Sequence, residues 1–295
     1  MARVSEKSKN PAGKRAKVGP NVCALAVMTK APAAGTSKTR LVPPLTITEA
    51  AKLSACFLKD TCDNIVCVSG NNQAHGVAVY TPVGAEAFFD GFVPRSFGRI
   101  PQRGSLFGDR LFHATQDLFA LGYDSLCLID SDSPTLPTAF LQEAISELAR
   151  PGDRVVLGPA DDGGYYLIGL KKSHRRLFED VDWSTSRVLV QTVARAKEIE
   201  LPVTLLPSWF DVDDAAALRQ LCYEMFIRTN NRATDSLPVP YPAPRTRSYL
   251  KRLIEQDGGQ RIWQSVAGFD KRARGESAPE TSAIPDGNTW DDHAI

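Results

Sequence analysis

The sequence predicts an α/β domain with a mostly parallel central sheet. Short apolar runs alternate with amphipathic stretches of helical length through the middle of the chain, and this alternation is typical of βαβ units. The chain has 295 residues, of which 43% are hydrophobic and 23% are charged, as expected for a globular protein that buries one core. Ligands bind such sheets beyond the carboxyl ends of the strands. Residues that follow the strands are therefore the functional candidates.

Hydrophobic periodicity defines each element in turn. Apolar runs predict strands at residues 22–28, 65–69, 77–80, 125–129, 154–157, 165–170 and 202–206. Apolar residues spaced three or four apart predict helices at residues 46–61, 106–121, 138–148, 184–198 and 215–228. Thr46 or Thr48 caps the first helix, Gly122 ends the second, and Ser184 caps the fourth.

The chain is expected to have three parts. Residues 1–20 form a basic arm that we expect to be disordered, with contact to nucleic acid or an anionic surface as the alternative. Residues 21–229 form the α/β domain. Residues 230–295 combine a Pro-rich linker, a short helix at 248–256 and a loose tail.

Composition disfavours several classes of protein. The net charge is +1, so no general field attracts nucleic acid or a membrane. No run approaches the roughly 18 apolar residues of a membrane helix, and the basic arm lacks the apolar run of a signal peptide. The six cysteines form no C-x-x-C pair and the four histidines have no metal-ligand spacing. Zinc and a disulfide framework are thus disfavoured, and a cytoplasmic location is expected.

A loop of small residues and cations follows the first predicted strand. Its sequence, KAPAAGTSKTRL, runs from Lys30 to Leu41, and Gly35 within it can take a positive φ angle. Lys38 and Arg40 offer cations, and the guanidinium fork suits phosphate oxygens. These features predict a phosphate cradle, although the spacing matches neither the Walker loop nor G-x-G-x-x-G. A basic surface turn is the alternative.

Carboxylates end two other predicted strands. Asp130 and Asp132 follow the strand at 125–129, and Asp211 and Asp213 follow the last one. Half-buried carboxylates need a partner, and Mg²⁺ or Mn²⁺ bridging a diphosphate is one, because these ions take carboxylate and phosphate oxygens. We predict that one carboxylate from each strand end holds the ion, Asp130 or Asp132 at the first and Asp211 or Asp213 at the second. Strand-end turns are the alternative, as is helix capping for the adjacent Asp214.

A third motif, GPADDGGYY, joins two predicted strands at residues 158–166. Gly163 and Gly164 permit close approach of a sugar or base to the backbone. Asp162 is a candidate general base or hydroxyl-binding carboxylate. The alternative is a hairpin turn in which the glycines supply positive φ angles.

Together the motifs resemble the bacterial glycosyltransferase-like family, also called the domain of unknown function 2064 family, of the nucleotide-diphospho-sugar transferase superfamily. The resemblance runs from about Val22 to Leu218. It rests on K-A-P-x-x-G-x-x-K-T-R-L at 30–41, S-D-S-P at 131–134, G-P-A-x-D-G-G-Y-Y-L-I-G at 158–169, W-S-T at 183–185 and D-V-D at 211–213. Such an ordered set is more specific than any one motif.

The resemblance implies a GT-A-like three-layer α/β/α sandwich that binds a nucleotide-activated substrate. The implied phosphate-binding residues are Lys30, Ala31, Pro32, Gly35, Lys38, Arg40, Gln102 and Gly104. The implied substrate contacts are Gly163, Gly164, Tyr165, Trp183 and Thr185. Asp132 resembles the D-x-D metal ligand, and Asp213 the distal metal carboxylate. The chain departs from the family in Q-x-G-x-D-L-G-x-R, where Leu106 replaces the acid.

The sequence therefore predicts a metal-dependent transferase, first of all a glycosyltransferase with a nucleotide-sugar donor. In this hypothesis Mg²⁺ or Mn²⁺ neutralises the leaving diphosphate, Lys38 and Arg40 share that task, and Asp162 is the base. The first alternative is a nucleotidyltransferase that joins a nucleoside triphosphate to a phosphorylated acceptor and releases pyrophosphate. The second is a non-catalytic nucleotide-sugar-binding module, which the Leu106 departure favours. Expected partners are the nucleotide substrate and a small-molecule acceptor, with neither nucleic acid nor a membrane span.

Overall fold

The fold is built on a seven-stranded sheet with the strand order β3-β2-β1-β4-β6-β5-β7. The computed structural model describes residues 19–69, 73–227, 238–256 and 261–262, so nearly all of the predicted basic arm and the tail from residue 263 lie outside the described residues. The strands are β1 (Cys23–Lys30), β2 (Ala74–Thr81), β3 (Gly98–Pro101), β4 (Ser125–Ile129), β5 (Val155–Pro159), β6 (Tyr165–Leu170) and β7 (Val203–Leu205). Only β6 pairs antiparallel with its neighbours, which confirms the mostly parallel sheet.

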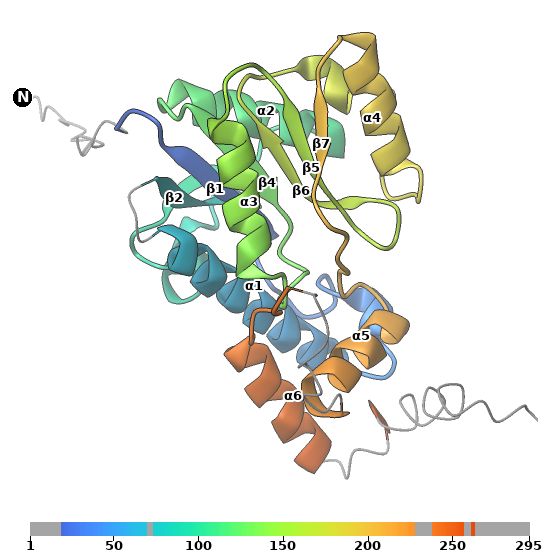
Figure 1. Ribbon diagram of the computed structural model, residues 1–295. Coiled ribbons are helices and arrows are strands. Elements are labelled where there is room, and N and C mark those ends of the chain that lie inside the picture. The colour runs from blue at the N-terminus through green and yellow to red at the C-terminus, as the bar shows by residue number, and fades with distance from the viewer. Residues whose placement is uncertain (1–18, 70–72, 228–237, 257–260, 263–295) are drawn as a thin grey trace, which may run out of the picture.

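Helices cover both faces of this sheet (Figure 1). They are α1 (Ile47–Ser69), α2 (Phe107–Ala120), α3 (Thr138–Ala149), α4 (Val188–Glu198), α5 (Ala215–Cys222) and α6 (Pro244–Gln256). Short 3₁₀ turns lie at Thr39–Leu41, Glu86–Gly91 and Arg175–Phe178, and a π-helical turn at Tyr223–Ile227 continues α5. Among the described residues, no helix is long and apolar enough to cross a membrane.

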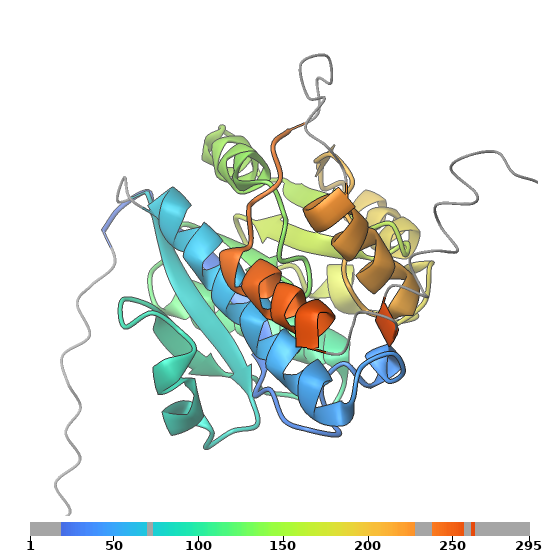
Figure 2. The same ribbon diagram turned by 90° about the horizontal axis from the view of Figure 1, so that it is seen from below.

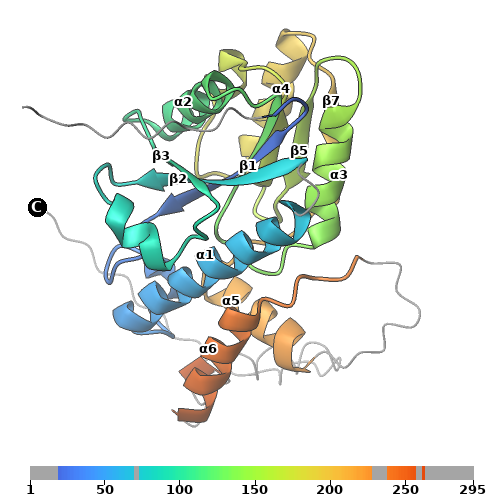
Figure 3. The same cartoon turned by 90° about the vertical axis from the view of Figure 1, so that its left-hand side faces the viewer.

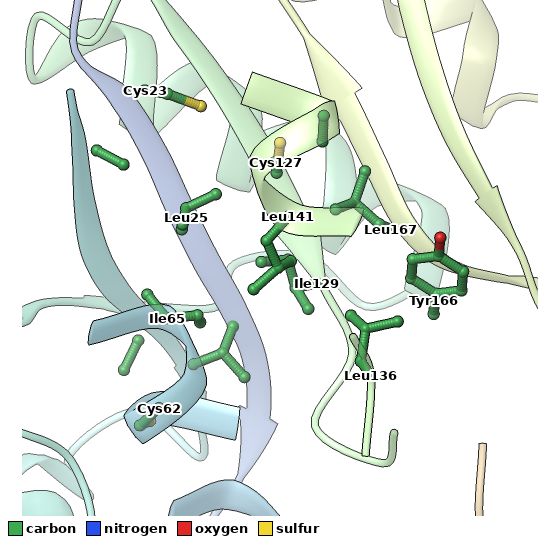
Figure 4. Packing of buried hydrophobic residues seen from close by; sticks show 14 of the residues in the cluster. Cys23, Leu25, Cys62, Ile65, Cys127, Ile129, Leu136, Leu141, Tyr166 and Leu167 are labelled. Atoms are coloured by element: carbon green, nitrogen blue, oxygen red, sulfur yellow. The ribbon is translucent and has the colours of Figure 1, made fainter. Parts of the chain in front are cut away.

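The core is divided between the two faces because side chains alternate along each buried strand. Leu25 of β1 and Ile129 of β4 pack with Ile65 of α1 and Leu141 of α3 on one face (Figure 4). On the other face, Ala26 and Leu128 belong to a cluster that includes residues of α2 and α4. The predicted three-layer α/β/α sandwich is therefore confirmed.

The strand predicted at residues 65–69 is wrong, because α1 continues through them to Ser69. Ile65 lies seven residues after Leu58, and both are fully buried, whereas Val66 is 43% exposed. This is helical spacing, and a short apolar run cannot by itself distinguish a strand from the last turns of a helix.

Two smaller differences have local causes. Ser184 has a φ angle of 64° and does not cap α4, which begins at Val188 after Arg187. The edge strand β3 was not predicted, because only Ile100 of its four residues is buried and it contains a glycine and a proline. Neither Gly nor Pro favours a strand interior.

The helix expected at residues 248–256 is present as α6, which begins at Pro244 and packs against α1 (Figures 2 and 3). Leu250 and Leu253 of α6 join a cluster with Leu53 and Phe57 on the side of α1 away from the sheet. Residues of α5 belong to the same cluster. Thus α6 is part of the structural unit that contains the sheet.

The start of α1 is held by two sets of contacts to Glu49. The Thr46 hydroxyl accepts from the Glu49 N–H at 3.2 Å and the Glu49 carboxylate accepts from the Thr46 N–H at 2.7 Å, which is a capping box and confirms Thr46 as the cap. Arg261 donates to both carboxylate oxygens, at 2.8 and 2.9 Å. Its hydrogen bonds are the main reason that the pKa of Glu49 is lowered to about 2.

Glu49→Gln is therefore expected to lower the free energy of unfolding by about 1 kcal/mol at pH 7, allowing for partial solvent screening. The pKa is lower in the folded state, so this stabilisation is present above the ordinary value of 4.5 and is lost as the pH falls towards about 2. Urea unfolding at a series of pH values measures the difference. Glu255→Gln, at an exposed pair with Lys251, should have little effect. A difference for Glu49→Gln that stays constant from pH 7 to pH 3 would contradict the assignment.

Candidate active site

Loops after β1, β4, β5 and β7 converge at the carboxyl edge of the sheet, where the sequence places its motifs. Two backbone hydrogen bonds tie three of them together. The Val212 N–H donates to the Asp132 carbonyl at 2.9 Å, and the Asp161 N–H donates to the Trp209 carbonyl at 3.0 Å. Acidic residues from separate parts of the sequence are thereby held in one place, as a parallel sheet predicts.

Two adjoining cavities open at this edge. They share the lining residues Met28, Arg40, Phe107, Ser131, Asp132 and Asp213. The basic cavity, of about 390 Å³, is also lined by Lys30, Lys38, Gln102 and Arg110. The acidic cavity, of about 320 Å³, is also lined by Asp130, Asp162, Asp211, Tyr165, Trp183 and Thr185. Their common wall holds both predicted metal ligands.

The ammonium group of Lys38 lies between these two ligands. Its Nζ is 2.9 Å from Oδ1 of Asp132 and 2.6 Å from Oδ1 of Asp213. The Lys38 side chain is only 7% exposed, whereas the carboxylates are 33% and 38% exposed. Burial by itself would lower the pKa of Lys38, but the attraction of both carboxylates outweighs it and raises that pKa. The ammonium group is thus charged at any ordinary pH.

Carboxylates crowd the acidic cavity. Burial, with repulsion from Asp132 and Asp211, raises the pKa of Asp130 well above its ordinary value. Asp130 accepts hydrogen bonds from the Asp132 N–H at 3.2 Å and the Ser133 hydroxyl at 3.0 Å. Burial also raises the pKa of Asp211 to about 6, with help from Asp162 and Asp213. A cation bound among these carboxyl groups would reduce their mutual repulsion and favour their charged forms.

Asp132 and Asp213 are close enough to share one ion, because both contact the single Nζ of Lys38. Mg²⁺ is commonly held by one or two carboxylates, with waters and substrate phosphates completing its shell. No group of three or more His, Cys, Asp and Glu residues suited to a metal is present within the described part of the chain. The residues therefore fit an ion that shares its coordination with a substrate, rather than a cage made by protein alone.

The loop of small residues and cations contributes unequally to the basic cavity. Of the predicted phosphate-binding residues, Lys30, Lys38, Arg40 and Gln102 line it, whereas Ala31, Pro32, Gly35 and Gly104 do not. The side-chain amide of Gln102 donates to the carbonyl groups of Thr29 and Val79, at 3.2 and 2.9 Å. Gln102 thus also ties together the ends of β1 and β2.

The paired glycines after β5 differ in role. Gly164 lines the acidic cavity and donates its N–H to Oδ1 of Asp162 at 2.8 Å. Gly163 does not line either cavity, has a φ angle of 89°, and packs against the carbonyl group of Ser186. Tyr165, Trp183 and Thr185 line the acidic cavity as well. Asp214 caps α5 by accepting from the N–H groups of Ala216 and Ala217, which confirms the capping alternative for that residue.

Gly163→Ala is expected to destabilise the protein by about 2 kcal/mol, because the new Cβ overlaps the Ser186 carbonyl oxygen and the φ angle of 89° disfavours any side chain. Thermal unfolding of both proteins measures the loss. Gly152→Ala is the matched control, since Gly152 has a φ angle of 86° but open space around its Cβ position. Equal losses in the two variants would show that the contact with Ser186 contributes nothing.

Phe107 was not predicted as a site residue, yet it lines both cavities and is 49% exposed. Its ring makes an edge contact with Trp183, with the ring centroids 5.2 Å apart. Gly108 allows this arrangement, because a Cβ there would lie 2.8 Å from the indole nitrogen of Trp183. The sequence signal that could have identified Phe107 was the apolar pair Leu106 and Phe107 at the start of a predicted helix.

Comparison with known proteins supports the resemblance seen in the motifs. Residues 53–185 match a family described as an uncharacterized protein conserved in bacteria (DUF2064). A solved structure from Desulfovibrio desulfuricans G20, described as a candidate nucleotide-diphospho-sugar transferase, has 28% sequence identity and a TM-score of 0.68, over 82% of this chain and 97% of that one. A cytidylyltransferase from Leptospira borgpetersenii serovar Hardjo-bovis has 10% identity and a TM-score of 0.44, over 80% and 94% of the two chains. That second likeness is too low to indicate activity. No curated protein matches the chain.

The match to DUF2064 covers β4 and the DGG motif but neither the Lys30–Leu41 loop nor Asp213. The similar structure covers most of the chain. The protein thus has a nucleotide-diphospho-sugar transferase-like fold, and its residues 53–185 carry the signature of the bacterial DUF2064 family.

Proposed function

We propose that this protein is a metal-dependent transferase for a nucleotide-activated substrate, and specifically a glycosyltransferase that uses a nucleotide-sugar donor. The observation that carries the proposal is the contact of Lys38, which lines the basic cavity, with Asp132 and Asp213, which line both the basic and the acidic cavity. Cations for phosphates and carboxylates for a metal then lie side by side. The description of the Desulfovibrio structure as a candidate nucleotide-diphospho-sugar transferase supports the same assignment.

In this proposal the basic cavity takes the diphosphate. Lys30, Lys38 and Arg40 line it, and phosphate oxygens accept charge-assisted hydrogen bonds from ammonium and guanidinium groups. Arg40 is 71% exposed and lies 3.6 Å from Asp213. It can therefore turn to a ligand without leaving a buried charge unpaired.

Asp132 and Asp213 would hold the Mg²⁺ or Mn²⁺ ion. When bound there, such an ion supplies positive charge that stabilises a leaving diphosphate. The protein's own contribution is to bring the two carboxylates together through the hydrogen bond between Val212 and Asp132. Lys38 and Arg40 add positive charge beside the same group.

The acidic cavity would take the sugar and its acceptor. Phe107 and Trp183 provide apolar surface, on which the face of a sugar ring can pack. Asp162 is the proposed base, and the Gly164 N–H orients its carboxylate. Asp211 is a second candidate base in this cavity, because burial raises its pKa to about 6.

A thermal-shift panel tests the proposal. The protein and Asp132→Asn are each heated with nucleotide-sugars and nucleoside triphosphates, in Mn²⁺ or in EDTA. A ligand at 100 times its Kd adds about 2.7 kcal/mol of stability, enough to raise the midpoint visibly. A Mn²⁺-dependent rise with one nucleotide-sugar, lost in Asp132→Asn, would support glycosyl transfer and identify the donor. A rise with a triphosphate alone would favour a nucleotidyltransferase, and no rise with any of these ligands would contradict the proposal.

A further inference from the structure

Lys38 occupies an unusual position for a lysine that binds phosphate. Its ammonium group is buried and contacts two carboxylates from different loops, at 2.9 and 2.6 Å. Arg40, two residues later, is 71% exposed, and its guanidinium group lies farther away, 3.6 Å from Oδ2 of Asp213. Of these two cations, Lys38 is therefore the one that is buried and contacts both Asp132 and Asp213.

The surrounding chain places Lys38 there. Its backbone has the left-handed angles φ 52° and ψ 43°, a conformation that costs a residue with a side chain energy unless its surroundings enforce it. The preceding loop is closed by the Ala33 N–H, which donates to the Ser37 hydroxyl at 3.1 Å. The Nζ also lies 5.8 Å from the ring centre of Phe57 on α1. The contact with the carboxylates is thus a feature of the folded loop rather than a chance surface pairing.

One consequence concerns any divalent cation at this place. The ammonium group lies within 2.9 Å of one oxygen from each carboxylate. An ion bound to the same two oxygens would lie within a few ångströms of Nζ, where repulsion between the charges is strong in a partly buried setting. Lys38 and a divalent cation therefore compete for Asp132 and Asp213.

We propose that Lys38 is an internal counter-cation that keeps Asp132 and Asp213 from binding a divalent cation until a diphosphate draws its ammonium group into the basic cavity. This inference rests on the proposed function, whose metal and phosphate sites it couples. Because coupling between two ligands is reciprocal, the cation in turn strengthens binding of the diphosphate. The site thus binds the metal ion together with the nucleotide, and its affinity for the ion is low when no nucleotide is bound.

The test measures Mn²⁺ bound to the protein, by water proton relaxation, without and with inorganic pyrophosphate. Lys38→Met removes the competing charge, Lys38→Gln is a second neutral variant, and Lys38→Arg keeps the charge. Lys30→Met is the matched control, because it removes one positive charge from the same cavity. Lys30 donates to the Thr36 carbonyl and, among the described residues, forms no ion pair with a carboxylate. Circular dichroism and thermal midpoints establish which variants are folded.

Without pyrophosphate, Lys38→Met and Lys38→Gln should bind Mn²⁺ at least about tenfold more tightly than wild type, as expected for removing a like charge a few ångströms away. Lys38→Arg should resemble wild type, and Lys30→Met should gain much less. Pyrophosphate should tighten Mn²⁺ binding strongly in wild type and less in Lys38→Met. Adding Asp132→Asn to Lys38→Met should abolish the gain.

Equal gains in Lys38→Met and Lys30→Met would overturn the inference, because net charge alone would then explain them. Weaker or unchanged Mn²⁺ binding by both neutral variants would overturn it too. If wild type still shows the Mn²⁺-dependent thermal shift with a nucleotide-sugar, the proposed function survives that result. If no folded variant binds Mn²⁺ with or without pyrophosphate, and no nucleotide gives a shift, both fail.

Discussion

Asp132→Asn is expected to abolish turnover while leaving the fold intact. Asp132 lies on the wall shared by both cavities and is 33% exposed at its side chain, so the amide is accommodated without burying a new polar group. Asparagine removes the negative charge that a hard divalent cation requires. Loss of such charge stabilisation in a transition state lowers rates by at least about 100-fold. The measurement is kcat, using the nucleotide-sugar that the thermal-shift panel identifies.

Asp214→Asn provides the matched control. Asp214 belongs to the same acidic segment as Asp213, but it caps α5 through the N–H groups of Ala216 and Ala217. Asparagine is an equally good cap, so this variant should keep both its stability and its activity. Comparable kcat values for wild type and Asp132→Asn would rule out a metal role for Asp132. A loss in both variants, in contrast, would point to the charge of the segment as a whole.

The sequence was sufficient to predict the strands that support the site and their order along the chain. β4 and β6 have the predicted bounds, because their apolar runs are interrupted sharply by Asp130 and by Lys171. Parallel strands deliver their carboxyl ends to one edge, so Asp132 and Asp213 could be expected near one another. That prediction needed only an acidic residue after each of the two strands.

The position of Lys38 could not be predicted in the same way. Its spacing from Arg40 suggests two equivalent phosphate ligands, whereas the structure buries Lys38 and leaves Arg40 exposed. The difference depends on the left-handed turn at Lys38 and on carboxylates more than ninety residues away along the chain. Likewise, the helical spacing of Tyr249, Leu250 and Leu253 indicates a buried face on α6, but it does not indicate that α1 covers that face.

Asp60→Ala is expected to lower the free energy of unfolding by about 3 kcal/mol, the largest stability effect that we predict. Asp60 lies on α1 and is 0% exposed. Its two oxygens accept hydrogen bonds from the backbone N–H groups of Arg245 and Thr246 at the start of α6, at 3.1 and 2.7 Å. The carboxylate thus caps α6 from another helix. Alanine would leave both donors without this acceptor, and each costs about 1–3 kcal/mol.

Asp60→Asn separates loss of charge from loss of the acceptor. Burial raises the pKa of Asp60, which means that the folded protein disfavours the charged form and a neutral amide is tolerated better than alanine. We expect Asp60→Asn to lose about 1 kcal/mol, since one carbonyl oxygen remains to accept. Urea unfolding measures both variants, and equal losses would contradict the capping role.

The effect of Asp60→Ala should also extend to the candidate site. The cluster between α1 and α6 includes Leu41, from the loop that carries Lys38, and Val212, which lies between Asp211 and Asp213. Loosening α6 removes packing from beneath both segments. In folded Asp60→Ala protein at 25 °C, Mn²⁺-dependent binding of the nucleotide should therefore be weaker than in wild type. Unchanged binding with reduced stability would mean that the sheet alone positions these loops.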